Sequence, residues 1–187
     1  MSTHYFWALA LPKSTKQTMH SQLGDVVEHF PFKRWVYWED YHITFAFLGS
    51  AEEQKLRRSI ELVGEAIENE RTFLLNLQGL GVFGSKKSPR IFWASVKKND
   101  KLMNLQSLVF KACLRSGFTL ESRPFAPHIT LARNWTGDDF DHNWLDTYNP
   151  YQEKLISFPA NEVVLYKTNL EKIPKYEPIA TFSLISE

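Results

Sequence analysis

The stretch YHITFAFLG, residues 41–49, contains the tripeptide His-Ile-Thr, and PHITLAR, residues 127–133, repeats this tripeptide. Each stretch holds His-Ile-Thr inside an apolar run rich in β-favouring residues, which is typical of a strand. Because side chains alternate along a strand, His42 and Thr44 share one face and Ile43 projects from the other. The second stretch repeats this arrangement. We therefore expect two strands that each bury an apolar face and present an imidazole and a hydroxyl to a cleft.

The two strands supply matching polar side chains, His42 with Thr44 and His128 with Thr130. Two imidazoles can act as general base and general acid in one step, since the reference pKa of histidine is about 6.5. Two hydroxyls can donate hydrogen bonds to non-bridging oxygens. An in-line displacement at a phosphodiester uses such a set, with base and acid on opposite sides of phosphorus. The tripeptide is therefore expected twice, because the attacking oxygen and the leaving oxygen of one displacement each need an imidazole and a neighbouring hydroxyl.

The flanking sequence predicts an α+β domain with two comparable lobes, each carrying one of these strands. Apolar spacing and Gly or Pro breaks divide the rest of the chain into strands, helices and loops. The expected strands are 5–11, 33–38, 41–48, 73–80, 91–96, 128–132, 161–170 and 180–186, and the expected helices are 13–30, 51–70 and 100–116. Residues 79–90, GLGVFGSKKSPR, are expected to form a Gly-rich loop, and residues 134–153 a surface loop.

The composition favours one compact domain over residues 1–187, since 43% of the residues are apolar and 14% aromatic. The 22 basic and 21 acidic residues give a net charge of +1, so an anionic ligand must be met by a local cluster. Cys113 is the only cysteine, which excludes an intramolecular disulfide framework. No apolar run reaches the roughly twenty residues that span a bilayer. We expect a cytoplasmic monomer that does not bind membranes.

The two His-Ile-Thr stretches resemble the motifs of a known family. HITFAFLG and PHITLAR are similar to the paired HxTx motifs of the two-histidine phosphoesterase superfamily, and specifically to the bacterial and archaeal RNA 2′,3′-cyclic phosphodiesterases, also called 2′-5′ RNA ligases. FWALALP, SPRIFWASV and EVVLYKTNL resemble further landmarks of that family, in the same order. The resemblance implies two pseudo-symmetric lobes whose antiparallel-rich sheets face a central cleft with helices outside. It also implies hydrolysis of a cyclic phosphate to a 2′-phosphate without a metal or other cofactor.

The resemblance also implies a role for each matching residue. His42 would be the proton donor to the leaving 3′ oxygen, and His128 the proton acceptor that activates water. Thr44 and Thr130 would hold the phosphoryl oxygens. Arg133, the last residue of HITLAR, would offset the phosphate charge. Simple alternation places Arg133 on the face opposite His128, so a bend or bulge at the strand end, or the reach of its side chain, is needed to bring it round.

Several alternatives remain open from the sequence. The substrate could be an RNA end, with 2′-5′ ligation as the reverse reaction, or a small cyclic nucleotide or ADP-ribose cyclic phosphate. A non-catalytic module that binds RNA ends would use the same cleft, and a zinc hydrolase would use the two histidines but lacks a convincing carboxylate ligand. The candidates for stacking a terminal base are Trp35, Trp38, Tyr41, Phe83 and Trp135.

Overall fold

The computed structural model describes residues 3–152 and 155–186. Along the chain its elements are β1 (Tyr5–Ala10), α1 (Lys13–Ser21), α2 (Gly24–His29), β2 (Phe32–Trp35), the 3₁₀ turn η1 (Trp38–Asp40), β3 (His42–Gly49), α3 (Glu53–Ile67), β4 (Phe73–Gly84), β5 (Pro89–Val96), α4 (Asp100–Arg115), β6 (His128–Trp135), α5 (Trp144–Thr147), β7 (Ser157–Ala160), β8 (Glu162–Thr168) and β9 (Tyr176–Ser183). Both His-Ile-Thr stretches lie on strands, as predicted.

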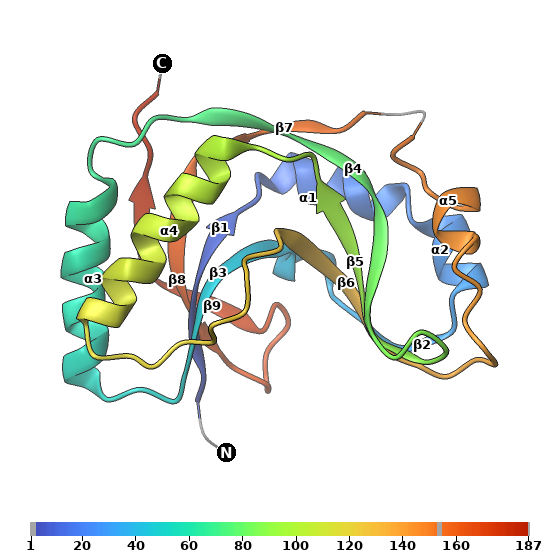
Figure 1. The fold of residues 1–187 in the computed structure, drawn as a ribbon, viewed down its shortest axis with the longest axis horizontal. Coiled ribbons are helices and arrows are strands. Elements are labelled where there is room, and N and C mark those ends of the chain that lie inside the picture. Colours follow the sequence, from blue (N-terminus) through green and yellow to red (C-terminus); the bar gives the residue numbers. More distant parts are fainter. Residues whose placement is uncertain (1–2, 153–154, 187) are drawn as a thin grey trace.

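The strands form one large antiparallel sheet, which confirms the α+β class (Figure 1). In the described part of the chain the order is β7-β4-β5-β6-β3-β1-β8-β9, and β2 pairs with β6 beside this path. β3 and β6 are joined through a single residue pair, Ile43 with Ile129. That pair divides the sheet into one half made of β1, β3, β8 and β9 and another made of β2, β4, β5, β6 and β7.

Different helices pack on the two halves of the sheet (Figure 1). α3 packs on the half that contains β1, where Trp7 Nε1 donates to Ser59 Oγ at 3.4 Å. The residue that follows α2, Phe30, stacks instead on Phe92 of β5, with ring centroids 5.0 Å apart. Both anchoring rings, Trp7 and Phe30, are fully buried. Each half of the sheet is therefore completed by a helix that adjoins one of its own strands in the chain, since α3 follows β3 and α2 precedes β2.

Three expected elements differ from the structure. Residues 13–30 form two helices that break before Gly24. Of the apolar side chains spaced for a single helix, Val27 is 44% exposed and the others are buried, namely Met19, Leu23, Val26 and Phe30. Residues 79–84 continue β4, so the Gly-rich loop is reduced to the short turn before β5. The segment 134–152 contains α5 and buries Phe140 and Tyr151, so the expectation of a surface loop is wrong there. Residue 153 of that predicted loop lies outside the described residues.

Candidate active site

The single pair between β3 and β6 brings the two His-Ile-Thr strands together. Ile43 and Ile129 are both fully buried in the core. In an antiparallel pair the positions on either side are opposed as well, so His42 faces Thr130 and Thr44 faces His128. These four side chains are half-buried, while both isoleucines are covered. The structure thus brings the four predicted residues together on one face, related by an approximate two-fold axis through the isoleucine pair.

Both histidines are oriented by a backbone carbonyl. His42 Nδ1 lies 2.7 Å from the carbonyl oxygen of Asp40, and His128 Nδ1 lies 2.7 Å from that of Ala126. Because a carbonyl only accepts, each Nδ1 must carry the proton that it donates. In the neutral ring Nε2 is then unprotonated, and His42 Nε2 accepts from Thr44 Oγ1 at 3.1 Å. Each ring therefore keeps Nε2 available to the site.

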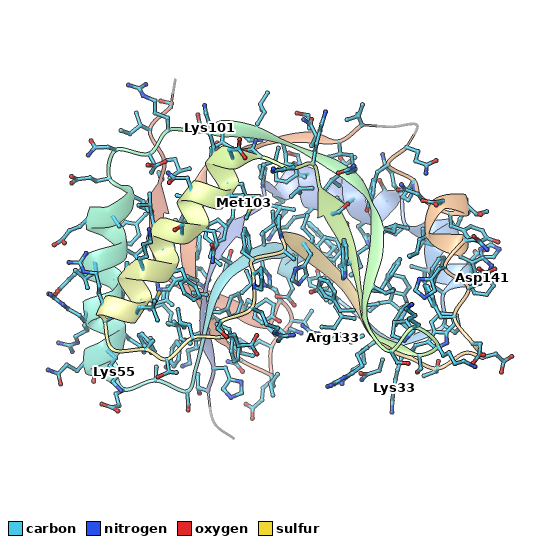
Figure 2. All side chains as sticks on the ribbon, in the orientation of Figure 1. Lys33, Lys55, Lys101, Met103, Arg133 and Asp141 are labelled. Atoms are coloured by element: carbon cyan, nitrogen blue, oxygen red, sulfur yellow. The ribbon has the colours of Figure 1, made fainter. Side chains whose placement is uncertain are left out.

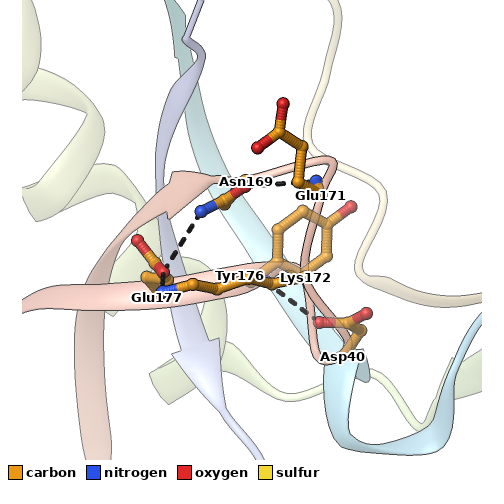
Figure 3. A network of polar contacts seen from close by, with 6 residues as sticks. All are labelled: Asp40, Asn169, Glu171, Lys172, Tyr176 and Glu177. Atoms are coloured by element: carbon orange, nitrogen blue, oxygen red, sulfur yellow. Dashed lines mark hydrogen bonds and ion pairs between the residues drawn. The ribbon is translucent and has the colours of Figure 1, made fainter.

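The carboxylate of Asp40 fixes the turn that precedes His42. It is buried, and its oxygen Oδ1 accepts the backbone N–H of Lys175 at 3.1 Å. The same oxygen accepts the backbone N–H of Tyr176 at 3.2 Å (Figure 3). These two donors lie where β9 begins, far from Asp40 in the sequence. The ring of Tyr176 then meets the ring of His42 edge-on, with centroids 5.1 Å apart. Asp40 thus holds His42 and Tyr176 in one arrangement through backbone contacts.

Aromatic rings surround both imidazoles. His42 lies against Phe6, with centroids 4.8 Å apart, and 6.1 Å from Tyr166. His128 meets Phe83 edge-on at 5.0 Å. Among the predicted stacking candidates Phe83 is therefore the one that contacts a site histidine, whereas Tyr41 and Trp135 are core residues. The walls of the site are apolar, and this lowers the stability of a charged imidazole.

A glycine on β4 makes room for a further aromatic ring beside His128. Trp93 lies 6.1 Å from the His128 ring and is the register partner of Gly81. A Cβ atom at Gly81 would approach the Trp93 ring to 2.3 Å. The absence of a side chain at Gly81 therefore lets the indole lie close to the sheet. This is the physical reason that GLGVFG is a strand despite its glycines.

The surroundings of both histidines favour the neutral ring. The pKa of His42 falls to about 4, mainly because the ring is buried, with smaller contributions from the charges of Lys16, His128 and Lys175. The hydrogen bond to Asp40 opposes this fall in pKa only in part. The pKa of His128 is also lowered, first by burial and then by Arg133. Near neutral pH both rings are therefore proton acceptors at Nε2 in the free protein.

The lowered pKa of His42 predicts a pH-dependent stability. In the unfolded chain His42 binds a proton near pH 6.5, whereas in the folded protein it stays neutral down to about pH 4. Its contribution to the free energy of unfolding is therefore complete above about pH 6.5 and is lost as the pH falls towards 4, by up to about 3 kcal/mol. The His42→Asn variant, which cannot titrate, should lose less stability than the wild type between about pH 7.5 and pH 4.5 in chemical denaturation.

The control for this prediction is His20→Asn, which removes an exposed histidine from α1. This variant should keep the pH dependence of the wild type. An equal loss of unfolding free energy in the wild type and in His42→Asn would contradict the lowered pKa of His42.

A β-bulge turns Arg133 towards the site. Trp93 pairs with Thr130, but the next residue of β5, Phe92, pairs with Ala132, so that Leu131 is an extra residue in β6. The extra residue reverses the alternation, and Arg133 projects on the side of Thr130. Figure 2 shows Arg133 near the middle of the molecule, between the two halves of the sheet. The bulge that the sequence required for Arg133 is therefore present.

β3 has the same bulge at the equivalent position. Ala8 pairs with Thr44 and Trp7 pairs with Ala46, so Phe45 is the extra residue. The bulged carbonyls find donors: Gln106 Nε2 donates to the carbonyl of Phe45 at 3.1 Å. In β6 the N–H of Val36 donates to the carbonyl of Leu131 at 2.8 Å. The position equivalent to Arg133 is then Phe47, whose side chain is 55% exposed.

Several residues of the site have no signal in the sequence. Phe6, Tyr166 and Tyr176 reach His42 only through strand pairing, and Trp93 reaches His128 in the same way. Asp40 carries a local signal, because a carboxylate two residues before a predicted site histidine could have been examined as a partner.

Over residues 3–152 and 155–186 no group of three or more His, Cys, Asp or Glu side chains could hold a metal ion. None of the described helices is long and apolar enough to cross a membrane.

Comparison with known proteins gives one consistent result. The profile of the family described as the 2′-5′ RNA ligase superfamily matches residues 12–171. The chain is 44% identical over 191 residues to the RNA 2′,3′-cyclic phosphodiesterase of Geobacillus stearothermophilus; the match covers 98% of this chain and 58% of that protein, less than two thirds of its length. It is 33% identical over 181 residues to the enzyme with the same name from Bacillus subtilis (strain 168), covering 97% and 96%. The structure of E. coli LigT complexed with 3′-AMP matches with a TM-score of 0.75 and 25% identity, covering 98% and 99%.

Proposed function

Because the chain belongs to the 2′-5′ RNA ligase superfamily, we propose that it hydrolyses 2′,3′-cyclic phosphates at RNA ends to 2′-phosphomonoesters. The observation that carries this proposal is the matched pair of imidazoles on β3 and β6, each with Nδ1 bonded to a carbonyl and Nε2 available. The relatives named RNA 2′,3′-cyclic phosphodiesterases support the choice of substrate. The single pair of Ile43 with Ile129, where the two halves of the sheet meet, supports the expectation of a site between two lobes.

In the proposed reaction His128 Nε2 takes a proton from water as its oxygen attacks phosphorus. The bond from phosphorus to the 3′ oxygen breaks, and His42 Nε2 gives that oxygen a proton. Atoms and charge balance, because one proton enters and one leaves the pair of imidazoles. Thr44, Thr130 and Arg133 bind the phosphoryl oxygens. The approximate two-fold relation between His42 and His128 supports an acid and a base on opposite sides of phosphorus, and the family resemblance supports His42 as the acid.

His42 must gain a proton at Nε2 before it can act as the acid. The pKa of about 4 in the free protein opposes this, but an anionic phosphate beside the ring favours the imidazolium and raises its pKa. Protonation also ends the hydrogen bond that Nε2 accepts from Thr44. The hydroxyl of Thr44 is then free to donate to a phosphoryl oxygen. Substrate binding thus prepares both groups for the reaction.

The motifs also allow other substrates and another functional class. A small cyclic nucleotide or ADP-ribose cyclic phosphate is the alternative substrate, and 2′-5′ ligation is the reverse of the proposed step. A non-catalytic RNA-end-binding module is the alternative from another functional class. A single domain over residues 1–187, a monomer, a cytoplasmic location and turnover without a cofactor also remain predictions.

The test is to incubate the purified protein, with EDTA present, with a short RNA that ends in a 2′,3′-cyclic phosphate. We expect the cyclic end to be converted to a 2′-phosphate with no 3′-phosphate, and chromatography of the digested product distinguishes the two. Binding without turnover would contradict catalysis and favour the recognition module. Loss of activity in EDTA, restored by added zinc, would favour metal-dependent hydrolysis.

A further inference from the structure

Two arginines oppose each other at the edge of the proposed site. Arg34 of β2 is the direct register partner of Arg133 of β6. Directly opposed side chains on antiparallel strands lie on the same face, so Arg34 shares the face of Arg133, which the bulge turns towards Thr130. Both arginines are exposed. Like charges in this arrangement destabilise a strand pair, so their juxtaposition needs a physical reason.

Neither arginine forms an ion pair with a carboxylate, at N···O distances up to 4.0 Å, among the residues that the structure describes. Lys175 adds a third cation from the start of β9. Burial lowers the pKa of Lys175 most, and the charges of Arg133 and Arg34 lower it further, although Asp40 opposes them. The three cations are thus close enough to repel one another.

The cations extend from the proposed cyclic-phosphate site towards the edge of the sheet, as the successive phosphates of a nucleotide strand would. Arg133 flanks the proposed cyclic-phosphate site, and Arg34 lies one strand further out, at the usual strand spacing of about 4.8 Å. A second phosphate of the same ligand would meet Arg34 while the cyclic phosphate occupies the histidines. A ligand with one phosphate would leave Arg34 without an anionic partner. An exposed guanidinium pair suits the oxygens of a phosphodiester, because arginine recognises phosphate with several donors.

We propose that Arg34 binds the phosphate on the 5′ oxygen of the nucleoside that carries the cyclic end, so that the site prefers an RNA strand to a cyclic mononucleotide. This inference rests on the proposed function and extends it, because it separates RNA from the small cyclic nucleotides that the two motifs leave open. In an RNA strand this phosphate is the last internal phosphodiester.

The experiment compares the wild type with Arg34→Gln and with the matched control Lys33→Gln. Lys33 is the exposed neighbour on β2, on the opposite face by strand alternation, and lies at the lower edge of the view in Figure 2. The substrates are adenosine 2′,3′-cyclic phosphate, the same nucleotide with a 5′-phosphate, and the dinucleotide ApA with a 2′,3′-cyclic phosphate end. The quantity to compare is kcat/KM for the dinucleotide divided by kcat/KM for the mononucleotide without a 5′-phosphate.

We expect Arg34→Gln to lower this ratio about tenfold, and Lys33→Gln to change it by less than about twofold. The dependence of log kcat/KM on log salt for the dinucleotide should also weaken by about 0.7 in Arg34→Gln. The thermal midpoint of Arg34→Gln should equal or exceed that of the wild type, since the substitution removes a repulsion. An unchanged ratio, or an equal fall in both variants, would overturn the proposal.

The remaining outcomes separate this inference from the proposed function. If the wild type hydrolyses the mononucleotide and the dinucleotide and Arg34→Gln leaves their ratio unchanged, the inference alone fails. If the wild type hydrolyses none of the three substrates, the proposed function fails and the inference fails with it. A loss in Arg34→Gln that is as large for the 5′-phosphorylated mononucleotide as for the dinucleotide supports the 5′-phosphate contact, but shows that the preference is not specific to a strand.

Discussion

Replacing His42 or His128 by alanine should reduce the hydrolysis of a 2′,3′-cyclic phosphate by about a thousandfold, since each variant loses a group that transfers a proton in the transition state. The two groups act in the same step. The double variant should therefore be little slower than either single variant, because losses from groups that act as a unit are not additive. Single-turnover rates on a cyclic-phosphate RNA end, measured at saturating enzyme, test this directly.

The controls distinguish catalysis from folding. His20→Ala removes an exposed histidine of α1 and should retain the wild-type rate. Both site variants should keep the wild-type circular dichroism and cooperative thermal unfolding, because the buried Ile43 and Ile129 that join the two strands are unchanged. A folded His42→Ala or His128→Ala variant with nearly normal turnover would exclude the proposed mechanism.

A substrate with a better leaving group separates the two roles. A phosphodiester with a nitrophenolate leaving group needs no proton from the enzyme when its bond to phosphorus breaks. His42→Ala should therefore recover much of its lost rate on this substrate, whereas His128→Ala should stay slow because water still has to be deprotonated. If only His128→Ala recovered its rate on this substrate, His128 would be the acid and His42 the base.

The second large effect is expected at Arg133. Arg133→Gln should lower kcat/KM for a cyclic phosphate about a hundredfold, because a fixed positive charge that stabilises a developing phosphoryl charge is removed. Arg133→Lys should restore only part of this loss, since lysine lacks the planar set of donors. The matched control is Arg115→Gln, an exposed arginine in the last turn of α4. It should leave kcat/KM unchanged.

The loss of Arg133 should also change the titration of its neighbour. Arg133 lowers the pKa of His128, so Arg133→Gln should raise that pKa, and NMR titration of the histidine ring signals measures the change. Wild-type kcat/KM in Arg133→Gln would remove Arg133 from the site. A lower kcat/KM with an unchanged pKa of His128 would place the charge of Arg133 further from the imidazole than the structure does.

The sequence predicts the local parts of this site and misses the distant ones. Strand alternation is a property of neighbouring residues, so His42 with Thr44 and His128 with Thr130 can be paired from the sequence. Whether the strands meet depends on one pair, Ile43 with Ile129, and the resemblance to a known family supplied that expectation.

The position of Arg133 shows the limit of local patterns. A bulge depends on how a strand pairs with its neighbours, and the carbonyls that it releases are satisfied by Gln106 and Val36, which are distant in the sequence. The contact of Asp40 with Tyr176 likewise joins residues that are distant in the sequence. GLGVFG was expected to be a loop because glycine disfavours strands, but the ring of Trp93 occupies the space above Gly81.

The common register and bulge of β3 and β6 have a consequence for the regiochemistry of the reaction. Two equivalent imidazoles, on the proposed chemistry, would open a cyclic phosphate at either ring oxygen and give a mixture of isomers. The two strands differ at Phe47 and Arg133, where one strand presents an exposed aromatic ring and the other a cation. A nucleotide is anionic at its phosphate and aromatic at its base, so this difference favours one of its two orientations. The choice of leaving oxygen then follows from one unlike pair in an otherwise symmetric backbone.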